Sequence, residues 1–215
     1  MGNIFSVDGA LYKTLSLLAD IFYVSLLWFV FSLPIVTIGA ATTAAYTVCT
    51  KRVTRSDAAI FRDFWQSFRQ KWWLATRLFL AAAALAGLAY ANLLSINQFD
   101  GNLRMFLFAA QIVLIVELAF VSVYLFALLS RLEMGFVQLF KTAFVMANRH
   151  MLTTLGVAAI GLSLLFLTAQ YLVLTILLPG IFLLSTAYLL MRVFRKYWPE
   201  LMPAEIPAES SEERP

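Results

Sequence analysis

The chain has 215 residues, of which 62% are hydrophobic and only 13% are charged, and its mean hydropathy is +0.84. Soluble domains have roughly half and a quarter of their residues in these two classes, and a domain of this size has too little interior to hide so much apolar surface. The composition also excludes intrinsic disorder for most of the chain, and a single cysteine, Cys49, excludes a disulfide scaffold. The sequence therefore predicts an all-α, polytopic membrane protein.

Four long tracts are almost free of charged side chains, and they define the predicted crossings. The tracts are 21–50, 78–99, 105–130 and 151–191, and the single charged residue within them is Glu117. A helix needs about 20 apolar residues to cross a hydrocarbon core of roughly 30 Å. The second and third tracts each fit one crossing, whereas the fourth is long enough for two.

The first and fourth tracts each leave an alternative open. In the first, Pro34 disfavours helix at Leu33, so Pro34–Gly39 is either a kink in one crossing or the turn of a hairpin. In the fourth, the turn lies either at Pro179-Gly180 or near Gln170. We prefer the hairpin, which gives six membrane helices instead of five. They are expected at about 15–33, 39–52, 74–96, 104–131, 151–173 and 176–196.

Two amphipathic segments, 57–73 and 134–149, separate these crossings. Aromatic residues recur in both at every fourth position, with polar residues on the other side, which predicts helices lying in the membrane interface. The segments align without gaps, pairing Phe64 with Phe140 and Phe68 with Phe144, and this suggests a parallel internal repeat. They either anchor the bundle at the headgroup level or form a docking face for another protein, because Trp and Arg are favoured in both settings. The candidate interfacial or docking residues are Phe61, Phe64, Trp65, Phe68, Arg69, Trp72, Phe136, Phe140 and Phe144.

Lysine and arginine concentrate in 51–77, in 131–149 and after the last crossing. Short loops rich in these residues stay in the cytoplasm, so we expect both chain ends inside and the loop at 100–104 outside. This basic charge indicates topology and does not require a nucleic-acid partner. A membrane domain over 1–198 is expected to be followed by a disordered cytoplasmic tail at 199–215, which is rich in Pro, Glu and Ser.

Few residues are candidates for chemistry. Glu117, at the centre of its tract, is a candidate intramembrane functional residue, and it is either a neutral side chain hydrogen-bonded between helices or a proton relay. Asp20 is expected to cap or snorkel near the inner surface, and His150 has no neighbouring metal ligand. We expect no cofactor, no metal and no enzyme activity, because phosphate-loop, metalloprotease and nucleophile-elbow motifs are missing.

Small residues recur at Ala83, Gly87 and Ala91, one helical turn apart. Such a stripe lets two helices pack closely. We expect it to pack within the bundle, with a dimer contact as the alternative.

The most specific stretch runs from Asp20 to Tyr46. Its core reads Leu27-Trp28, then Ser32-Leu33-Pro34-Ile35-Val36-Thr37-Ile38-Gly39-Ala40-Ala41-Thr42-Thr43-Ala44, followed downstream by Ile60-Phe61-Arg62-Asp63-Phe64 and Phe68. This pattern resembles the YesL-like family of bacterial membrane proteins (DUF624), over about residues 3–196, with Pro34 and Gly39 as structural motif positions. The resemblance implies a small multi-span protein of the bacterial cytoplasmic membrane, often encoded beside carbohydrate uptake genes. The family offers no agreed catalytic residues to carry over.

Together these observations favour an accessory membrane component of a carbohydrate ABC importer, whose partners are the lipid bilayer and the sugar permease subunits. The alternative is a small secondary transporter that uses Glu117 and the parallel repeat. A third interpretation is an assembly or envelope-stress protein with no ligand. The substrate, the individual partner and the oligomeric state stay open at this point.

Overall fold

The computed structural model describes residues 10–54, 59–98, 101–171 and 176–197, and helices are the regular structure found there. Five of the helices, α1, α3, α4, α6 and α7, are long and apolar enough to cross a membrane, which confirms the expected all-α, multi-span fold. The expected tail at 199–215 lies outside the described residues. The helices are α1 (Ala10–Ser32), α2 (Ile38–Val53), α3 (Ile60–Ser95), α4 (Gly101–Arg131), α5 (Phe136–Arg149), α6 (Met151–Gln170) and α7 (Leu178–Tyr197), with short 3-10 turns at η1 (Ile35–Thr37) and η2 (Ile96–Gln98).

Helices α1 and α2 form a hairpin. α1 ends at Ser32, and Pro34, which has no N–H, adopts extended backbone angles before η1. Near the turn, Trp28 Nε1 donates to Thr42 Oγ1 at 3.0 Å, and further away Arg52 meets Asp20 at 2.6 Å. The residue number falls along α1 from the first contact to the second while it rises along α2, so the two helices are antiparallel. The structure thus has the hairpin arrangement, but α2 has 16 residues and is too short for a full crossing.

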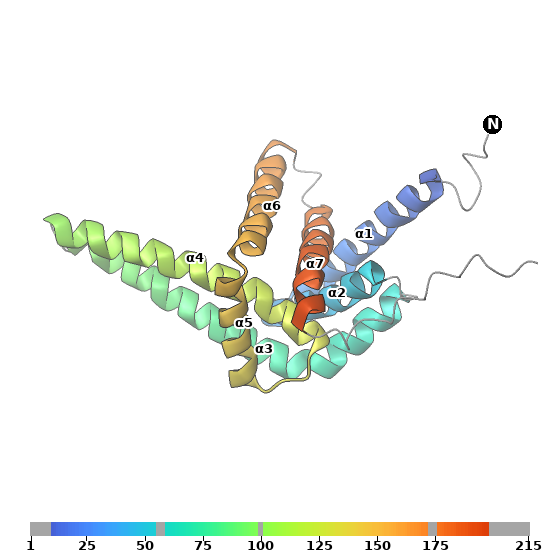
Figure 1. Cartoon of the computed structure of the whole chain (residues 1–215), viewed down its shortest axis with the longest axis horizontal. Helices are drawn as coiled ribbons and strands as arrows, with labels where there is room; N and C mark the ends of the chain where they lie inside the picture. Colours follow the sequence, from blue (N-terminus) through green and yellow to red (C-terminus); the bar gives the residue numbers. More distant parts are fainter. Residues whose placement is uncertain (1–9, 55–58, 99–100, 172–175, 198–215) are drawn as a thin grey trace, which may run out of the picture.

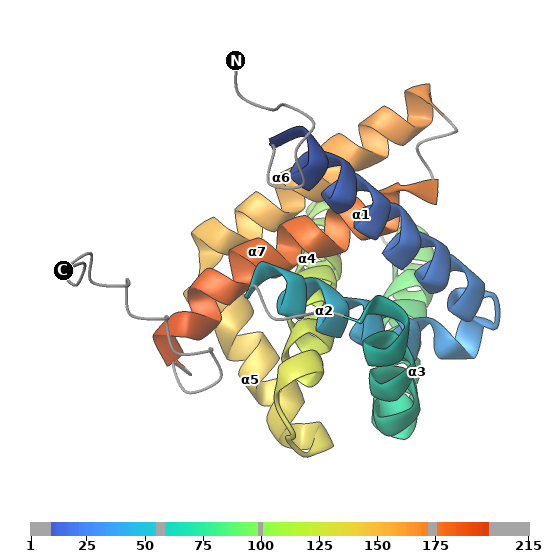
Figure 2. The same cartoon turned by 90° about the vertical axis from the view of Figure 1, so that its right-hand side faces the viewer.

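Helix α2 lies at the centre of the fold, in contact with α1, α3, α4 and α7 (Figure 2). Its buried positions are mostly Ala, Gly and Thr, which let neighbouring helices approach closely. A Cβ at Gly39 would lie 2.7 Å from the Ala75 carbonyl oxygen of α3. The buried hydroxyl of Thr43 donates to the Gly39 carbonyl at 2.9 Å, so this buried polar group has its hydrogen-bond partner within its own helix.

Helices α3 and α4 form a long antiparallel arm that extends away from the other helices (Figure 1). Gly101, with φ of 66°, provides the left-handed conformation needed where α4 begins. Near this tip Asn92 donates to the buried Gln111, and Gln111 donates to the Ala89 carbonyl, at 2.9 and 2.8 Å. The outer halves of both helices expose many large apolar side chains, as expected for surfaces that contact lipid.

The expected boundary between an interfacial helix at 57–73 and a crossing at 74–96 is wrong. Helix α3 is continuous over 36 residues, about 54 Å, because no Gly or Pro interrupts it between Ile60 and Ala86. The second amphipathic segment, in contrast, is the separate helix α5, which ends one residue before His150. The two segments also differ in environment, since Phe68 is buried whereas its aligned partner Phe144 is exposed.

The turn after α6 follows its end at Gln170, and α7 begins at Leu178. Pro179 and Gly180 are therefore in the first turn of α7, where proline is well tolerated, and they do not form the turn. The expected packing of Ala83, Gly87 and Ala91 within the bundle is also wrong. All three residues are exposed, and no other residue lies within 4 Å of a Cβ placed on Gly87.

Candidate functional site at the junction of α1, α2 and α7

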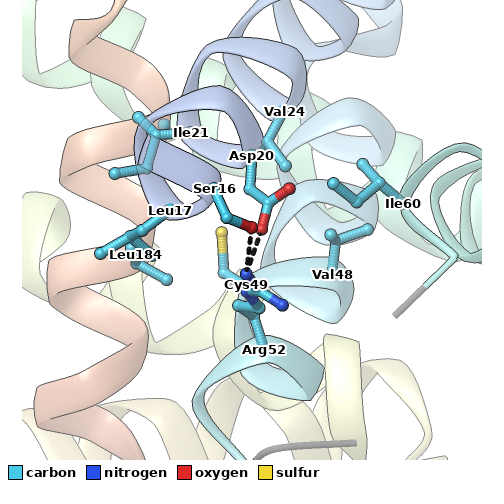
Figure 3. A pocket seen from close by; sticks show the side chains of 11 residues that line it. Ser16, Leu17, Asp20, Ile21, Val24, Val48, Cys49, Arg52, Ile60 and Leu184 are labelled. Atoms are coloured by element: carbon cyan, nitrogen blue, oxygen red, sulfur yellow. Dashed lines mark hydrogen bonds and ion pairs between the residues drawn. The ribbon is translucent and has the colours of Figure 1, made fainter. Parts of the chain in front are cut away.

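A small pocket of about 90 Å³ lies where α1, α2 and α7 meet, and we call it the junction pocket (Figure 3). Its polar side chains are Ser16 and Asp20 from α1 and Cys49 and Arg52 from α2, and the remaining wall is largely aliphatic. Arg52 binds Asp20 at 2.6 Å and donates to Ser16 Oγ at 3.2 Å. Asp20 was expected to cap or snorkel, and the structure instead places it in an interhelical ion pair.

The chemistry available in the junction pocket is limited. The Asp20 carboxylate is neutralised by Arg52, and no histidine in the wall could deprotonate the Cys49 thiol. The aliphatic wall suits a small apolar group better than a charged one. Among the residues that the structure describes, no group of three His, Cys, Asp or Glu side chains could hold a metal ion.

A set of cation contacts joins α2, α3 and α4. Lys51 at the end of α2 binds Asp63 at the start of α3, with 2.9 Å between Nζ and Oδ1. Lys71 Nζ donates to the carbonyls of Leu129 and Ser130 at 2.6 and 2.8 Å. These are among the last carbonyls of α4, which have no partner within the helix, and a cation is favoured at this negative end of the helix dipole.

The aromatic residues expected at the surface of 57–73 divide into two sets. Phe64 and Phe68 are buried against Phe31 of α1, with ring centroids 5.3 and 5.1 Å apart, and Trp72 is partly buried beside Phe68. Phe64 and Phe68 thus form part of the contact between α1 and α3 and are not available for docking, and Trp65 also touches Phe31, with 5.8 Å between the ring centroids.

The other set forms an exposed ridge along the outside of α3. Phe61, Trp65, Arg69 and Trp73 follow one another at four-residue spacing, and all four are exposed. We call this set the α3 ridge. Trp73, which is 73% exposed, was missed among the sequence candidates although its four-residue spacing from Arg69 was visible in the chain.

On α5, Phe136 and Phe144 are exposed and Phe140 is partly buried, whereas Leu139 and Ala143 face the core. Asn148 near the end of this helix donates to Glu117 Oε1 at 2.6 Å. Glu117 thus accepts a hydrogen bond from another helix, as one of its two sequence interpretations expected, and the donor comes from the amphipathic segment. Glu117 is partly exposed and is not in the wall of the junction pocket.

Part of the chain matches a known protein family. Residues 21–93 match DUF624, which is described as a protein of unknown function. The match confirms the resemblance to DUF624 over about half of α1, all of α2 and nearly all of α3, and it is shorter than the expected 3–196. No curated protein and no solved structure matches this chain.

Proposed function

We propose that this chain, a multi-span protein with a DUF624 segment over residues 21–93, is a non-enzymatic accessory component of a bacterial carbohydrate ABC importer. It contacts the permease subunits through the α3 ridge. The ridge is the observation that carries the proposal. It exposes two tryptophans and an arginine, the residue types that are enriched among interface hot spots, and it lies within the segment that matches the family.

The ridge is held in place before any partner binds. The adjacent side of the same helix turns is packed through Phe64 and Phe68 against Phe31. Trp65 of the ridge also contacts Phe31, at 5.8 Å between centroids, and Lys51 binds Asp63. A rigid helix face loses little conformational entropy on association, which favours binding. A docking surface that is ordered in this way is expected to bind a partner more tightly than a mobile loop would.

The proposed orientation places the start of α3 on the cytoplasmic side. Lys51, Arg52, Lys71 and Arg131 gather where α2, α3 and α4 meet, and cationic connectors stay in the cytoplasm. The N-terminal turns of α3 extend beyond one membrane thickness, since the helix is about 54 Å long. The ridge then reaches the cytoplasmic surface, where a permease subunit presents its own loops.

The alternative of a stand-alone transporter receives less support from the geometry. Glu117 is engaged by Asn148, and it lines no part of the junction pocket. The accessory role therefore has the stronger support, and a variant at Glu117 tests the proton relay.

The experiment is site-specific photocrosslinking in native membranes that contain the carbohydrate permease. A photoreactive side chain replaces Trp65 or Trp73, and a matched control replaces Phe166, which is exposed on α6 away from the ridge. We expect crosslinks to a permease subunit from the two ridge positions and none from the control. Arg69→Glu should weaken copurification of the permease by roughly tenfold or more, whereas Arg104→Glu at the tip of the arm should leave it unchanged.

Absence of every permease subunit from the crosslinked products, with the protein normally inserted, contradicts the proposal. Equal crosslinking from position 166 would also contradict it, because the contact would then not depend on the ridge.

A further inference from the structure

A shallow groove of about 300 Å³ lies between α5 and α7, distinct from the junction pocket. It is lined by Lys141, Thr142, Val145, Met146, Arg149 and Tyr197. Its wall thus contains two cations, two hydroxyl groups and two apolar side chains, and no carboxylate. We call it the α5–α7 groove.

Contacts at one end of the groove hold its groups in place. The Arg149 guanidinium lies over the Tyr197 ring, 5.4 Å from the ring centroid. The Tyr197 hydroxyl hydrogen-bonds His150 Nε2 at 3.0 Å. Arg149 and Lys141 are both exposed, and neither forms an ion pair with a carboxylate within the described ranges of the chain. The groove as a whole therefore has an excess of positive charge and exposed hydrogen-bond donors.

The position of the groove relative to the membrane indicates which kind of anion it could bind. The span of α6 begins at Met151, directly after Arg149 and His150, and the span of α7 ends at Tyr197. A bilayer that covers both spans would therefore have its lipid phosphate layer at the depth of the groove. The apolar Val145 and Met146 line the groove together with the cations. The first residues of α6, Met151 and Leu152, are exposed, where acyl chains would begin.

We propose that the α5–α7 groove binds the phosphodiester headgroup of an anionic phospholipid. Lys141 and Arg149 pair with the phosphate, and the Thr142 hydroxyl donates to a headgroup oxygen. Basic pockets at the ends of membrane helices provide this chemistry, and arginine binds phosphate oxygens with two parallel hydrogen bonds. The proposal is independent of the accessory role and requires only that the chain spans a membrane.

His150 provides a clean reporter, because it is the only histidine in the chain. Partial burial lowers the pKa of this imidazole, and the nearby cations Lys196 and Arg149 lower it further. A phosphate between the cations would oppose this effect, because a nearby opposite charge favours the protonated form by about one to three units.

The experiment follows the His150 pKa by NMR of histidine-labelled full-length protein in nanodiscs. Pure phosphatidylcholine is compared with a mixture containing phosphatidylglycerol, and with phosphatidylcholine plus inorganic phosphate. A diffuse negative surface potential by itself raises any surface pKa by about half a unit. We expect phosphatidylglycerol to raise the His150 pKa by about one unit beyond that, and inorganic phosphate to have no comparable effect.

Variants separate a built site from the diffuse potential. Lys141→Gln and Arg149→Gln should each reduce the response to phosphatidylglycerol to the diffuse level. Arg149→Lys should retain part of it, and Arg62→Gln on α3, a matched loss of one exposed charge, should respond like the unmodified protein. An equal response in every variant overturns the site, and an equal response to inorganic phosphate overturns the assignment to lipid.

Discussion

Asn148 of α5 donates its side-chain amide to Oε1 of Glu117, 2.6 Å away, on the adjacent helix α4. This contact gives an acidic side chain, in the middle of an otherwise uncharged tract, a partner that is a donor and carries no charge. A neutral acid or an amide at position 117 can accept the same hydrogen bond, whereas an alkyl group cannot.

Glu117→Gln should therefore retain the stability of the protein, and Glu117→Leu should lower it by about 1 kcal/mol, a typical value for a hydrogen bond between membrane helices. Thermal unfolding of both variants in the same detergent measures the difference. Equal destabilisation by Gln and Leu would show that the charge, and not the hydrogen bond, matters here. Loss of proton or sugar flux in proteoliposomes containing Glu117→Gln, with stability retained, would instead favour the transporter alternative.

Two glycines on successive helices should respond in opposite ways to alanine. At Gly39 the new Cβ would lie 2.7 Å from both the Ala75 carbonyl oxygen and Phe79 Cβ, so Gly39→Ala should destabilise the fold by about 1–3 kcal/mol. Gly87 has open space around it, and Gly87→Ala should stabilise α3 by about 0.5–1 kcal/mol. Unfolding temperatures of the two variants provide the comparison, and a loss of stability in Gly87→Ala would indicate a helix packed on that face.

Substitution of Lys51 and substitution of Asp63 should lower stability by different amounts, because 36% of the lysine side chain is exposed but only 4% of the aspartate side chain. Lys51→Met leaves a buried carboxylate without its cation and should cost about 3 kcal/mol. Asp63→Asn should cost less, since water can reach the lysine. The double variant Lys51→Met with Asp63→Leu should recover part of the loss, and a strictly additive result from denaturant unfolding would contradict the coupling.

Stability should decrease in mildly acidic solution because of His150. Its pKa in the folded state is below the unfolded value of about 6.5, so the unfolded chain binds the proton first as the pH falls. The contribution is fully present above about pH 6.5 and decreases as the pH falls toward the folded pKa. In neutral detergent, the unfolding temperature of the unmodified protein should decrease more between pH 7.5 and 5.5 than that of His150→Asn. Parallel curves for the two proteins would contradict this assignment.

Local pattern was sufficient for much of the architecture. The uncharged tracts predicted the spans that became α1, α4, α6 and α7, and the break at Pro34 followed from the missing N–H. The same pattern was not sufficient for 57–73, because an amphipathic stretch and an apolar stretch can share one uninterrupted helix. Periodicity predicts which residues lie on one side of a helix and leaves open what that side contacts.

The candidate surface shows this limit most clearly. Phe64 and Trp65 are adjacent in the sequence and similar in chemistry, and both contact Phe31, yet the first is fully buried and the second stays 44% exposed on the α3 ridge. The partner helix α1 is about thirty residues away in the chain, so no local pattern could assign the two roles. The junction pocket and the α5–α7 groove depend on contacts between segments still more distant.

The sequence by itself determined that the chain inserts into a membrane, because long tracts without charge are stable as helices in hydrocarbon and in few other settings. The tertiary structure alone decided which apolar side chains face protein and which face outward. In a bilayer both environments are apolar, so hydropathy does not distinguish them, and the choice depends on the shapes of neighbouring helices.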